Sequence, residues 1–512
     1  MNSRTTRACD PCRLRKVKCN GSTPCYQCAH LNLACVYSPQ TSKRKPTVRG
    51  RLVAQIRDGA RPDDARSGSA SPNADGTSPG SSIPTSVGSM YTSDFFLKLV
   101  PDFEQVVFPV NPIILPSEMV SIIQEVDQSF ENAALVYAFA AVTINLTQTS
   151  WDADGDMPAR MLDLMDHSFK AHRQAELAAG IRGRLPANVK RAMTCVFLEI
   201  CMMAFKRFDR ALAVLREAVT MIQMLDLDRY TDGSLSTHEI ATRQRIYWEI
   251  YIHERFLSMM AGYPVVLPPL RLGLPVTDIE IPPCINAGFN RLIDLFMVLD
   301  ETFLSYWKAQ QDPQHVAPEM TAAWIEYKQA QLDQNELETA EIDSKLIANG
   351  FWGLTELQHA DLFITRLWLR TLVWQLALSQ GLLQSAPLQN SHEGFSMHFP
   401  AQRLSTQLRS LVSRLEKVES IALHGSGILR KLFEITSTVA DVLALPIRHG
   451  QVQDDESRME NFLFLVTFLL TFDRIEASQR EYLKEKLSTL RKEHAAGFHS
   501  LATYNPECWP SD

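Results

Sequence analysis

Six cysteines near the N-terminus have the residue type and the spacing to bind metal ions. They are Cys9, Cys12, Cys19, Cys25, Cys28 and Cys35, within the run CDPCRLRKVKCNGSTPCYQCAHLNLAC. Both halves of the run repeat one pattern, a CxxC pair followed after six residues by a third cysteine. Each half therefore offers three thiolates, whereas a closed tetrahedral zinc site needs four protein ligands. Six thiolates complete two sites only if two sulfurs are shared, so the spacing predicts a binuclear cluster holding two Zn²⁺ ions.

Three other roles for these cysteines agree less well with the sequence. A disulfide framework requires a secretory context, but the start MNSRTTRACD is polar and basic without an apolar signal segment, so we expect reduced thiols. A mononuclear zinc site built from the two CxxC pairs would leave Cys19 and Cys35 without a role. A redox CxxC of the thioredoxin type needs a surrounding βαβ pattern, which this segment lacks.

Positive charge is concentrated around the cysteines. Residues 1–57 contain 12 Lys and Arg against a single acid, Asp10, which gives a net charge of +11. Because the whole chain carries −7, residues 58–512 carry −18. A compact basic segment on an acidic remainder is typical of a DNA-binding domain, since neutralising phosphates and releasing counterions supplies affinity.

Only the first half of the cysteine run suits DNA, because its loop reads RLRKVK whereas the matching stretch after Cys28 reads AHLNLA. Arg and Lys donate to guanine acceptors in the major groove, which admits a short helix. The predicted DNA contacts are Arg13, Arg15, Lys16 and Lys18. The alternative is that these side chains only offset the negative charge of the cluster. A second basic run, suited to a phosphate-tracking linker or a nuclear import signal, comprises Lys43, Arg44, Lys45, Arg49 and Arg51.

The six spacings, the basic loop and Pro24 before Cys25 resemble the fungal binuclear zinc cluster family, the Zn2Cys6 transcription factors of the galactose-regulator type. The resemblance covers about residues 9–35. It implies that Cys9 and Cys25 bridge the two zinc ions. It also implies a nuclear protein that binds double-stranded DNA and acts on the transcription machinery.

The resemblance also assigns roles within the basic loop. Arg15 and Lys16 are placed to read a CGG-type triplet, and Arg13 and Lys18 to contact phosphate. In the family a dimerising coiled coil follows the cluster, but here the apolar heptad positions end at Ile56, and a stable zipper needs about three or four heptads. A monomer and a homodimer therefore both remain open.

The rest of the chain divides by composition. We expect a zinc cluster DNA-binding domain at residues 1–40 and a basic, then Gly/Ser/Pro-rich flexible linker at 41–93. Residues 94–512 have the hydrophobic content of a globular region and should form an all-α regulatory domain, which a Pro-rich break near 264–283 could divide into two subdomains.

Apolar residues recur at three- and four-residue spacing through this region, as in RALAVLREAVTMIQMLDLDRY. The pattern predicts further helices at 134–146, 161–179, 190–205, 241–260, 360–380, 402–417, 426–445, 456–474 and 478–494. Two apolar runs, 362–378 and 462–472, should be buried helices rather than membrane spans. The first contains Arg366 and Arg370, and the second is much shorter than the roughly 20 residues that a span needs.

The stretch from VLREAVTMIQMLDLDRY to IYWEIYIHERFLSMMAGYPVVLP resembles the fungal-specific middle homology region found with this cluster. The matching positions are Arg243, Arg245, Trp248, Glu254, Arg255 and Pro264. For their side chains we expect helix packing and buried ion pairing rather than ligand contact, and the effector is unknown. The LREA and ERF variants resemble a subgroup that includes amylolytic and maltose regulators and activators of secondary-metabolite gene clusters.

Several enzyme motifs are missing from this sequence. His238–Glu239 and His253–Glu254 do not complete HExxH, and Walker and GxGxxG patterns do not occur. Our first hypothesis is a pathway-specific activator of a secondary-metabolite gene cluster, and the alternative is a regulator of sugar utilisation genes. A hypothesis of another class is a zinc-dependent interaction protein that binds an acidic partner without reading DNA sequence.

Overall fold

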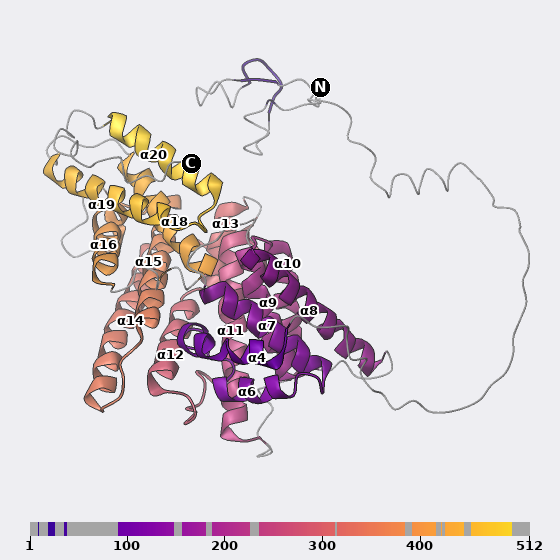
Figure 1. The fold of residues 1–512 in the computed structure, drawn as a ribbon. Coiled ribbons are helices and arrows are strands. Elements are labelled where there is room, and N and C mark those ends of the chain that lie inside the picture. Colours follow the sequence, from indigo (N-terminus) through magenta and orange to yellow (C-terminus); the bar gives the residue numbers. More distant parts are fainter. Residues whose placement is uncertain are drawn as a thin grey trace, which may run out of the picture. The chain divides into compact units, whose positions relative to one another are not determined.

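The computed structural model divides the chain into two units, Met1–Ser82 and Ile83–Asp512, which we call the head and the body (Figure 1). It describes residues 9, 19–25, 35–37, 91–147, 156–180, 187–225, 235–312, 315–384, 392–415, 421, 425–444 and 452–493. The described part of the body is mostly α-helical, as predicted, and the isolated bridge between Gln384 and Ser396 is its single β-type pairing.

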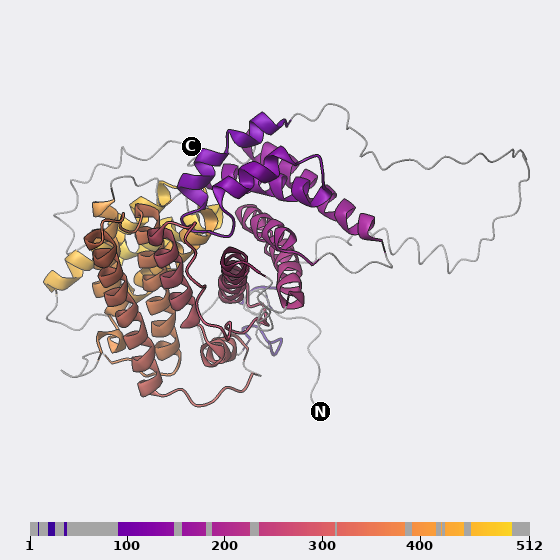
Figure 2. The same ribbon diagram turned by 90° about the horizontal axis from the view of Figure 1, so that it is seen from below.

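The N-terminal helices of the body, coloured indigo to magenta, gather on one side of it in both views (Figures 1 and 2). They are α4 (Ser93–Leu97), α5 (Val100–Asp102), the π-helix η1 (Phe103–Val107), α6 (Pro116–Gln124), α7 (Phe130–Thr147), α8 (Asp156–Ala179), α9 (Val189–Ala204), α10 (Phe208–Met224) and α11 (Thr237–Ala261).

The remaining helices are coloured from pink through orange to yellow, and most of them lie on the other side of the body. They are α12 (Pro283–Met297), α13 (Glu301–Gln311), α14 (Ala322–Ala348), α15 (Glu356–Ser379), η3 (Glu393–Phe395), η4 (Pro400–Leu404), α16 (Ser405–Arg414), α18 (Gly425–Leu443), α19 (Val452–Leu470) and α20 (Ala477–Glu493). Helix α11 contacts α9, α10 and α12, and α9 contacts α18, so the two sides are packed together.

Helix α7 lies in the core of the N-terminal side and packs against α8, α9 and α6. Among the described residues it is the one helix long and apolar enough to cross a membrane by length and composition, and 72% of it is buried inside the body. Its apolar residues are thus already covered by protein, as expected for a central core helix, which can be as long and as apolar as a membrane span.

Local signals explain the boundaries of α11. Its N-cap Ser236 accepts a hydrogen bond from the Glu239 backbone, and the Glu239 carboxylate accepts from Ser236 N at 2.8 Å, which is a capping box. The helix ends at Gly262, where φ is +70°, a left-handed conformation that glycine adopts without steric cost. The chain then runs without regular helix to α12, across the Pro-rich break that the sequence indicated.

Helix α15 contains the apolar run with two arginines. Both guanidinium groups are buried and point to α14: Arg366 donates to Asn335 Oδ1 at 3.0 Å, and Arg370 pairs with Asp333 at 2.7 Å and Glu336 at 2.8 Å. Buried charges require such partners. The run at 362–378 is therefore a core helix, as expected.

The helices predicted from apolar spacing are all present, and their ends differ from the prediction by up to a few residues. The linker was expected to extend to residue 93, but Tyr91 already belongs to the body. Its side chain is 7% exposed, its hydroxyl donates to Asp163 at 2.8 Å, and its ring packs against Phe95 and Tyr137. A single aromatic residue after a polar stretch does not reveal such packing in advance.

Candidate metal centre

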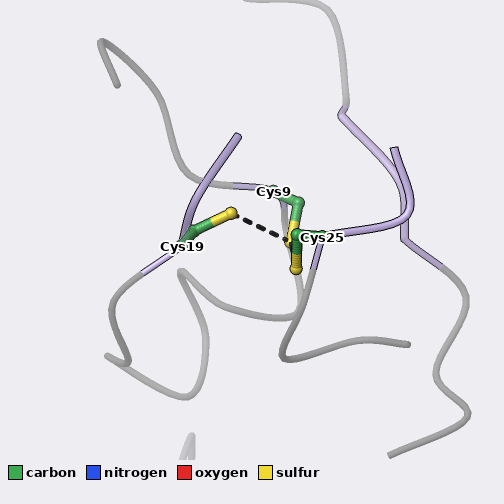
Figure 3. Close-up of side chains that lie close together, drawn as sticks. All are labelled: Cys9, Cys19 and Cys25. Atoms are coloured by element: carbon green, nitrogen blue, oxygen red, sulfur yellow. Dashed lines mark hydrogen bonds between the residues drawn. The ribbon is translucent and has the colours of Figure 1, made fainter. Parts of the chain in front are cut away.

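Three cysteine sulfurs converge in the head. The Sγ atoms of Cys9, Cys19 and Cys25 all lie within 4.8 Å of one another, and all three side chains are buried (Figure 3). Cys9 Sγ is 3.6 Å from Cys25 Sγ and 3.9 Å from Cys19 Sγ. Sulfurs bound tetrahedrally to one zinc at about 2.3 Å lie about 3.8 Å apart. The observed spacing therefore fits thiolates that share a zinc ion.

A fourth sulfur joins this group. Cys35 Sγ accepts a hydrogen bond from the backbone N of Cys25 at 3.2 Å. Cys35 Sγ thus lies near the backbone of Cys25, while the Cys25 sulfur lies next to that of Cys9. The bridging role that the resemblance implies for Cys9 and Cys25 stays a prediction.

The surroundings of Cys19 favour its thiolate form. Gly21 N donates to Cys19 Sγ at 3.5 Å, and Tyr37 Oη lies 3.7 Å from the same sulfur. The backbone N–H groups of Cys9 and Gly21 lower the pKa of the Cys19 thiol, because they stabilise the negative charge on sulfur. The hydrogen bond to Cys19 raises the pKa of the Tyr37 hydroxyl, which therefore stays a donor. Thiolate is the form that binds zinc.

Most of the other predicted site residues lie outside the described part of the chain. This holds for two of the six cysteines, for the basic loop and for the second basic run: Cys12, Cys28, Arg13, Arg15, Lys16, Lys18, Lys43, Arg44, Lys45, Arg49 and Arg51. The structure brings together the described members of the cysteine set, and the DNA contacts stay predictions.

A second cluster of potential metal ligands occurs in the body, formed by His172, Cys195 and Glu217. Glu217 accepts hydrogen bonds from His172 Nε2 at 2.6 Å and from Arg191 NH2 at 2.8 Å, so a guanidinium already supplies the positive charge. Burial raises the pKa of the Cys195 thiol well above its usual value, which disfavours the thiolate. We therefore interpret this cluster as a partly buried ion pair between Arg191 and Glu217, with His172 hydrogen-bonded to the carboxylate.

Two of the residues matched to the middle homology region, Glu254 and Arg255, bind α11 to the segment that follows it. Glu254, 2% exposed, accepts hydrogen bonds from Val266 N at 3.0 Å and Leu267 N at 2.9 Å, and it also pairs with Arg216 of α10. The guanidinium of Arg255 donates to Leu267 O at 3.0 Å. These contacts are helix packing and buried ion pairing, as expected.

Two other matched residues act in the same way. Arg245 donates to Asp278 at 3.0 Å and to Pro112 O at 2.8 Å, and Trp248 Nε1 donates to Gly273 O at 3.0 Å. Both side chains are 1% exposed. These hydrogen bonds hold the 262–282 segment against α11. Because both side chains are almost fully buried, neither is exposed to bind a ligand directly.

The sequence did not indicate a polar cluster inside the body around His253. Its Nδ1 lies 2.5 Å from Glu199 Oε2 of α9, and its Nε2 lies 3.0 Å from Glu249 Oε1, one turn earlier on α11. The one available signal was the Glu249–His253 pair at four-residue spacing, which places both on one helix face. Glu199 is far away in the sequence, so its part in the cluster could not be inferred.

Known proteins match this chain at two levels. Residues 7–44 match the fungal Zn(2)-Cys(6) binuclear cluster domain. Over most of its length the chain is 23% identical to the maltose fermentation regulatory protein MAL13 of Saccharomyces cerevisiae, covering 85% of this chain and 84% of that protein. It is also 23% identical to the probable sucrose utilization protein SUC1 of Candida albicans, covering 95% and 88%. The respiratory transcription factor ZNF1 of Saccharomyces cerevisiae is likewise 23% identical, covering 90% and 89%.

Proposed function

We propose that this chain, a fungal Zn(2)-Cys(6) transcription regulator whose N-terminal cluster domain binds two zinc ions, controls genes for sugar utilisation by binding double-stranded DNA in the nucleus. The observation that carries the proposal is the convergence of buried cysteine sulfurs at zinc-ligand spacing, at the start of a chain that aligns with sugar-related regulators over most of its length.

Within the head, the proposed zinc ligands are Cys9, Cys12, Cys19, Cys25, Cys28 and Cys35, with Cys9 and Cys25 shared between the metals. When bound, zinc supplies the cross-links that a head of this size cannot obtain from a hydrophobic core. The described core of the head consists of cysteines with Tyr37 packed beside them. Arg15 and Lys16 then read guanine edges, while Arg13 and Lys18 bind phosphate.

We assign the three parts of the chain as follows: a DNA-binding domain at 1–40, a basic and flexible linker at 41–90, and a regulatory body from Tyr91 to 512. The second basic run would contact phosphate or direct nuclear import. The interaction of Glu254, Arg245 and Trp248 with the 262–282 segment makes the matched region a structural centre of the body.

The relatives support sugar utilisation better than our first hypothesis of secondary metabolism. Two of the three aligned regulators carry maltose or sucrose in their names, and none refers to a biosynthetic cluster. Deleting the gene in its own organism and following growth on single carbon sources tests this choice. Loss of growth on particular sugars supports the proposal, whereas normal growth with loss of a secondary metabolite would reverse the order of the two hypotheses.

DNA reading is tested by in vitro selection of random duplexes with full-length, zinc-loaded protein at near-physiological salt, where non-specific phosphate attraction is weak. We expect enrichment of CGG-containing sites. Paired triplets at fixed spacing would identify a homodimer, and single triplets a monomer. If no sequence is enriched while both zinc ions are present, the head is an interaction module for acidic partners and the proposal fails.

A further inference from the structure

A cleft of about 530 Å³ lies on the body between the end of α11, the 262–268 segment and α13. Clefts that hold small molecules measure roughly 300–1,000 Å³, are mostly apolar, and carry a few polar groups that orient the ligand. The apolar lining of this cleft includes Val265, Val266, Leu304 and Trp307, and polar side chains lie among these residues. Its size and its mixed lining are therefore those of a ligand site.

The walls of the cleft are anchored from the side that faces away from it. Glu254 and Arg255 of α11 hold the 262–268 segment through hydrogen bonds with its backbone. Helix α13 buries Phe303 and Tyr306 in the core of the body. The cleft is thus formed before a ligand arrives, and a preformed site lowers the entropy cost of binding.

Two aromatic side chains line the cleft and are only half-buried, Trp307 of α13 and Tyr263 of the 262–268 segment. The indole ring of Trp307 stacks on the buried ring of Phe303, with 6.4 Å between the centroids and 24° between the planes. This neighbour holds the indole in one orientation. A rigid aromatic ring offers a large flat apolar surface, against which the C–H groups of another ring can pack. The cleft therefore provides a platform for a ring-shaped ligand.

The accessible polar side chains include neutral groups that both donate and accept hydrogen bonds. Tyr263 is half-buried and Gln311 is exposed, and neither side chain forms a hydrogen bond with the described residues. Ser305, also half-buried, has its Oγ 3.2 Å from His315 Nε2, so its hydroxyl belongs to a polar pair on the wall. The hydroxyl groups of a ligand suit such partners, because a hydroxyl both donates and accepts.

The exposed charges at the cleft balance each other. Glu301 and Lys308 of α13 both line it, and they carry opposite signs. Arg255 lines it too, but its side chain is 2% exposed and its NH1 lies 3.8 Å from the Glu254 carboxylate, so this cation already has an acidic neighbour. A neutral ligand therefore fits the cleft without leaving a charge unpaired.

We propose that the cleft between α11, the 262–268 segment and α13 binds a neutral mono- or disaccharide. The sugar ring stacks on Trp307, and its hydroxyl groups pair with Tyr263, Ser305 and Gln311. This inference rests on the proposed function, because it names the class of effector that a regulator of sugar utilisation would bind. Growth on single carbon sources tests that function, whereas direct binding tests the cleft, so either result can fail without the other.

The test measures ligand binding to the full-length, zinc-loaded protein by saturation-transfer NMR and calorimetry. D-glucose and maltose are the sugar probes, with one ring and two rings. Sorbitol carries its hydroxyl groups on an open chain, and indole is flat and apolar without hydroxyl groups. We expect at least one of the two sugars to bind, and sorbitol and indole to bind at least tenfold more weakly than that sugar.

Two pairs of variants locate the binding site. Trp307→Leu keeps an apolar side chain beside Phe303 but removes the flat ring, so we expect sugar binding to weaken at least tenfold. Its control is Trp352→Leu, because Trp352 is 88% exposed and does not line the cleft. Gln311→Ala removes a hydrogen-bond partner and should weaken binding severalfold. Gln310→Ala changes the exposed neighbour on α13, which does not line the cleft, and should leave binding unchanged.

Thermal melting of each variant separates loss of the site from loss of the fold. Sugar binding that falls in Trp307→Leu and Gln311→Ala but not in their controls, in proteins that still melt cooperatively, supports the proposal. If Trp307→Leu does not fold, the comparison of Gln311→Ala with Gln310→Ala decides. The proposal is overturned if neither sugar binds, if sorbitol or indole binds as tightly as the sugar, or if the cleft variants bind sugar like the wild type.

Discussion

At the scale of single residues, the head and the body use buried polar groups for different purposes. In the head, the sulfurs of Cys9, Cys19 and Cys25 lie within 4.8 Å of one another, which is the ligand type and spacing that a zinc ion binds. In the body, by contrast, the buried carboxylate of Glu254 has a cationic partner and backbone donors. The buried polar groups of the head are therefore suited to binding a metal ion, whereas the buried carboxylate of Glu254 serves to hold parts of the body together.

Replacing a shared zinc ligand should affect both metals. Cys25→Ser removes the sulfur that lies 3.6 Å from Cys9 and next to Cys35, so we expect zinc content to fall from two ions towards none and the head to unfold, because metal binding and folding are coupled. Metal analysis of the purified protein measures this. Cys284→Ser, a buried thiol of the body, is the control and should keep both ions. One retained zinc ion in a folded head would show separate sites.

Base reading and phosphate binding should respond differently to mutation. Lys16→Ala is expected to cost about 1–3 kcal/mol on the selected site and to relax specificity at one base pair. Lys43→Ala, in the second basic run, should weaken binding to all sequences alike and reduce the salt slope by about one. Competition binding at several salt concentrations distinguishes the two. Uniform loss across sequences in Lys16→Ala would contradict a base-reading role.

At the scale of elements, apolar spacing predicted most of the long helices of the body, although it missed α12, whose buried face is apolar. It did not predict α14, because the buried positions of this helix include Lys328, Gln329, Asn335 and Thr339 beside Ile325 and Leu332. The polar side chains on this buried face can be explained only when their partners on other helices are known. One example is Arg366 of α15, which donates a hydrogen bond to Asn335. In the same way the cysteine spacing predicted the metal centre, whereas the polar cluster around His253 depends on Glu199 of α9, whose position beside α11 no local pattern encodes.

The docking of the 262–268 segment onto α11 depends on one carboxylate. Glu254→Ala removes the acceptor of Val266 N and Leu267 N and the carboxylate that pairs with Arg216, which keeps only its hydrogen bond to Pro264 O. We therefore expect a loss of about 3–5 kcal/mol in the free energy of unfolding. Urea denaturation measures it. Glu326→Ala, on the exposed face of α14, should change stability by less than about 0.5 kcal/mol. Equal effects of the two changes would mean that the segment does not depend on Glu254.

The imidazolium between α9 and α11 should make body stability pH-dependent. Burial opposes the charge on His253, yet Glu199 and Glu249 raise its pKa to about 10, above the usual 6.5. Its contribution is therefore complete below about pH 6.5 and is lost as the pH rises through 10, with a slope of at most about 1.4 kcal/mol per pH unit. Urea denaturation from pH 6 to 10 should show this decline, and His253→Gln should reduce it.

The exposed His359→Gln serves as the matched histidine control and should leave the decline unchanged. If wild type and His253→Gln lose stability in parallel over this range, the charge on His253 does not contribute as proposed.

At the scale of the whole molecule, the head and the body keep separate cores, so zinc removal should affect only one of them. The head's described core is a group of cysteines with Tyr37, whereas the body has a continuous apolar core and its own ion pairs. Chelating zinc should abolish selective DNA binding while far-UV circular dichroism and the thermal transition of the body stay unchanged, because the body core is built from apolar side chains of its own helices. Restoring zinc should restore DNA binding. A concerted loss of helical signal on chelation would instead show that the folding of the body depends on the cluster.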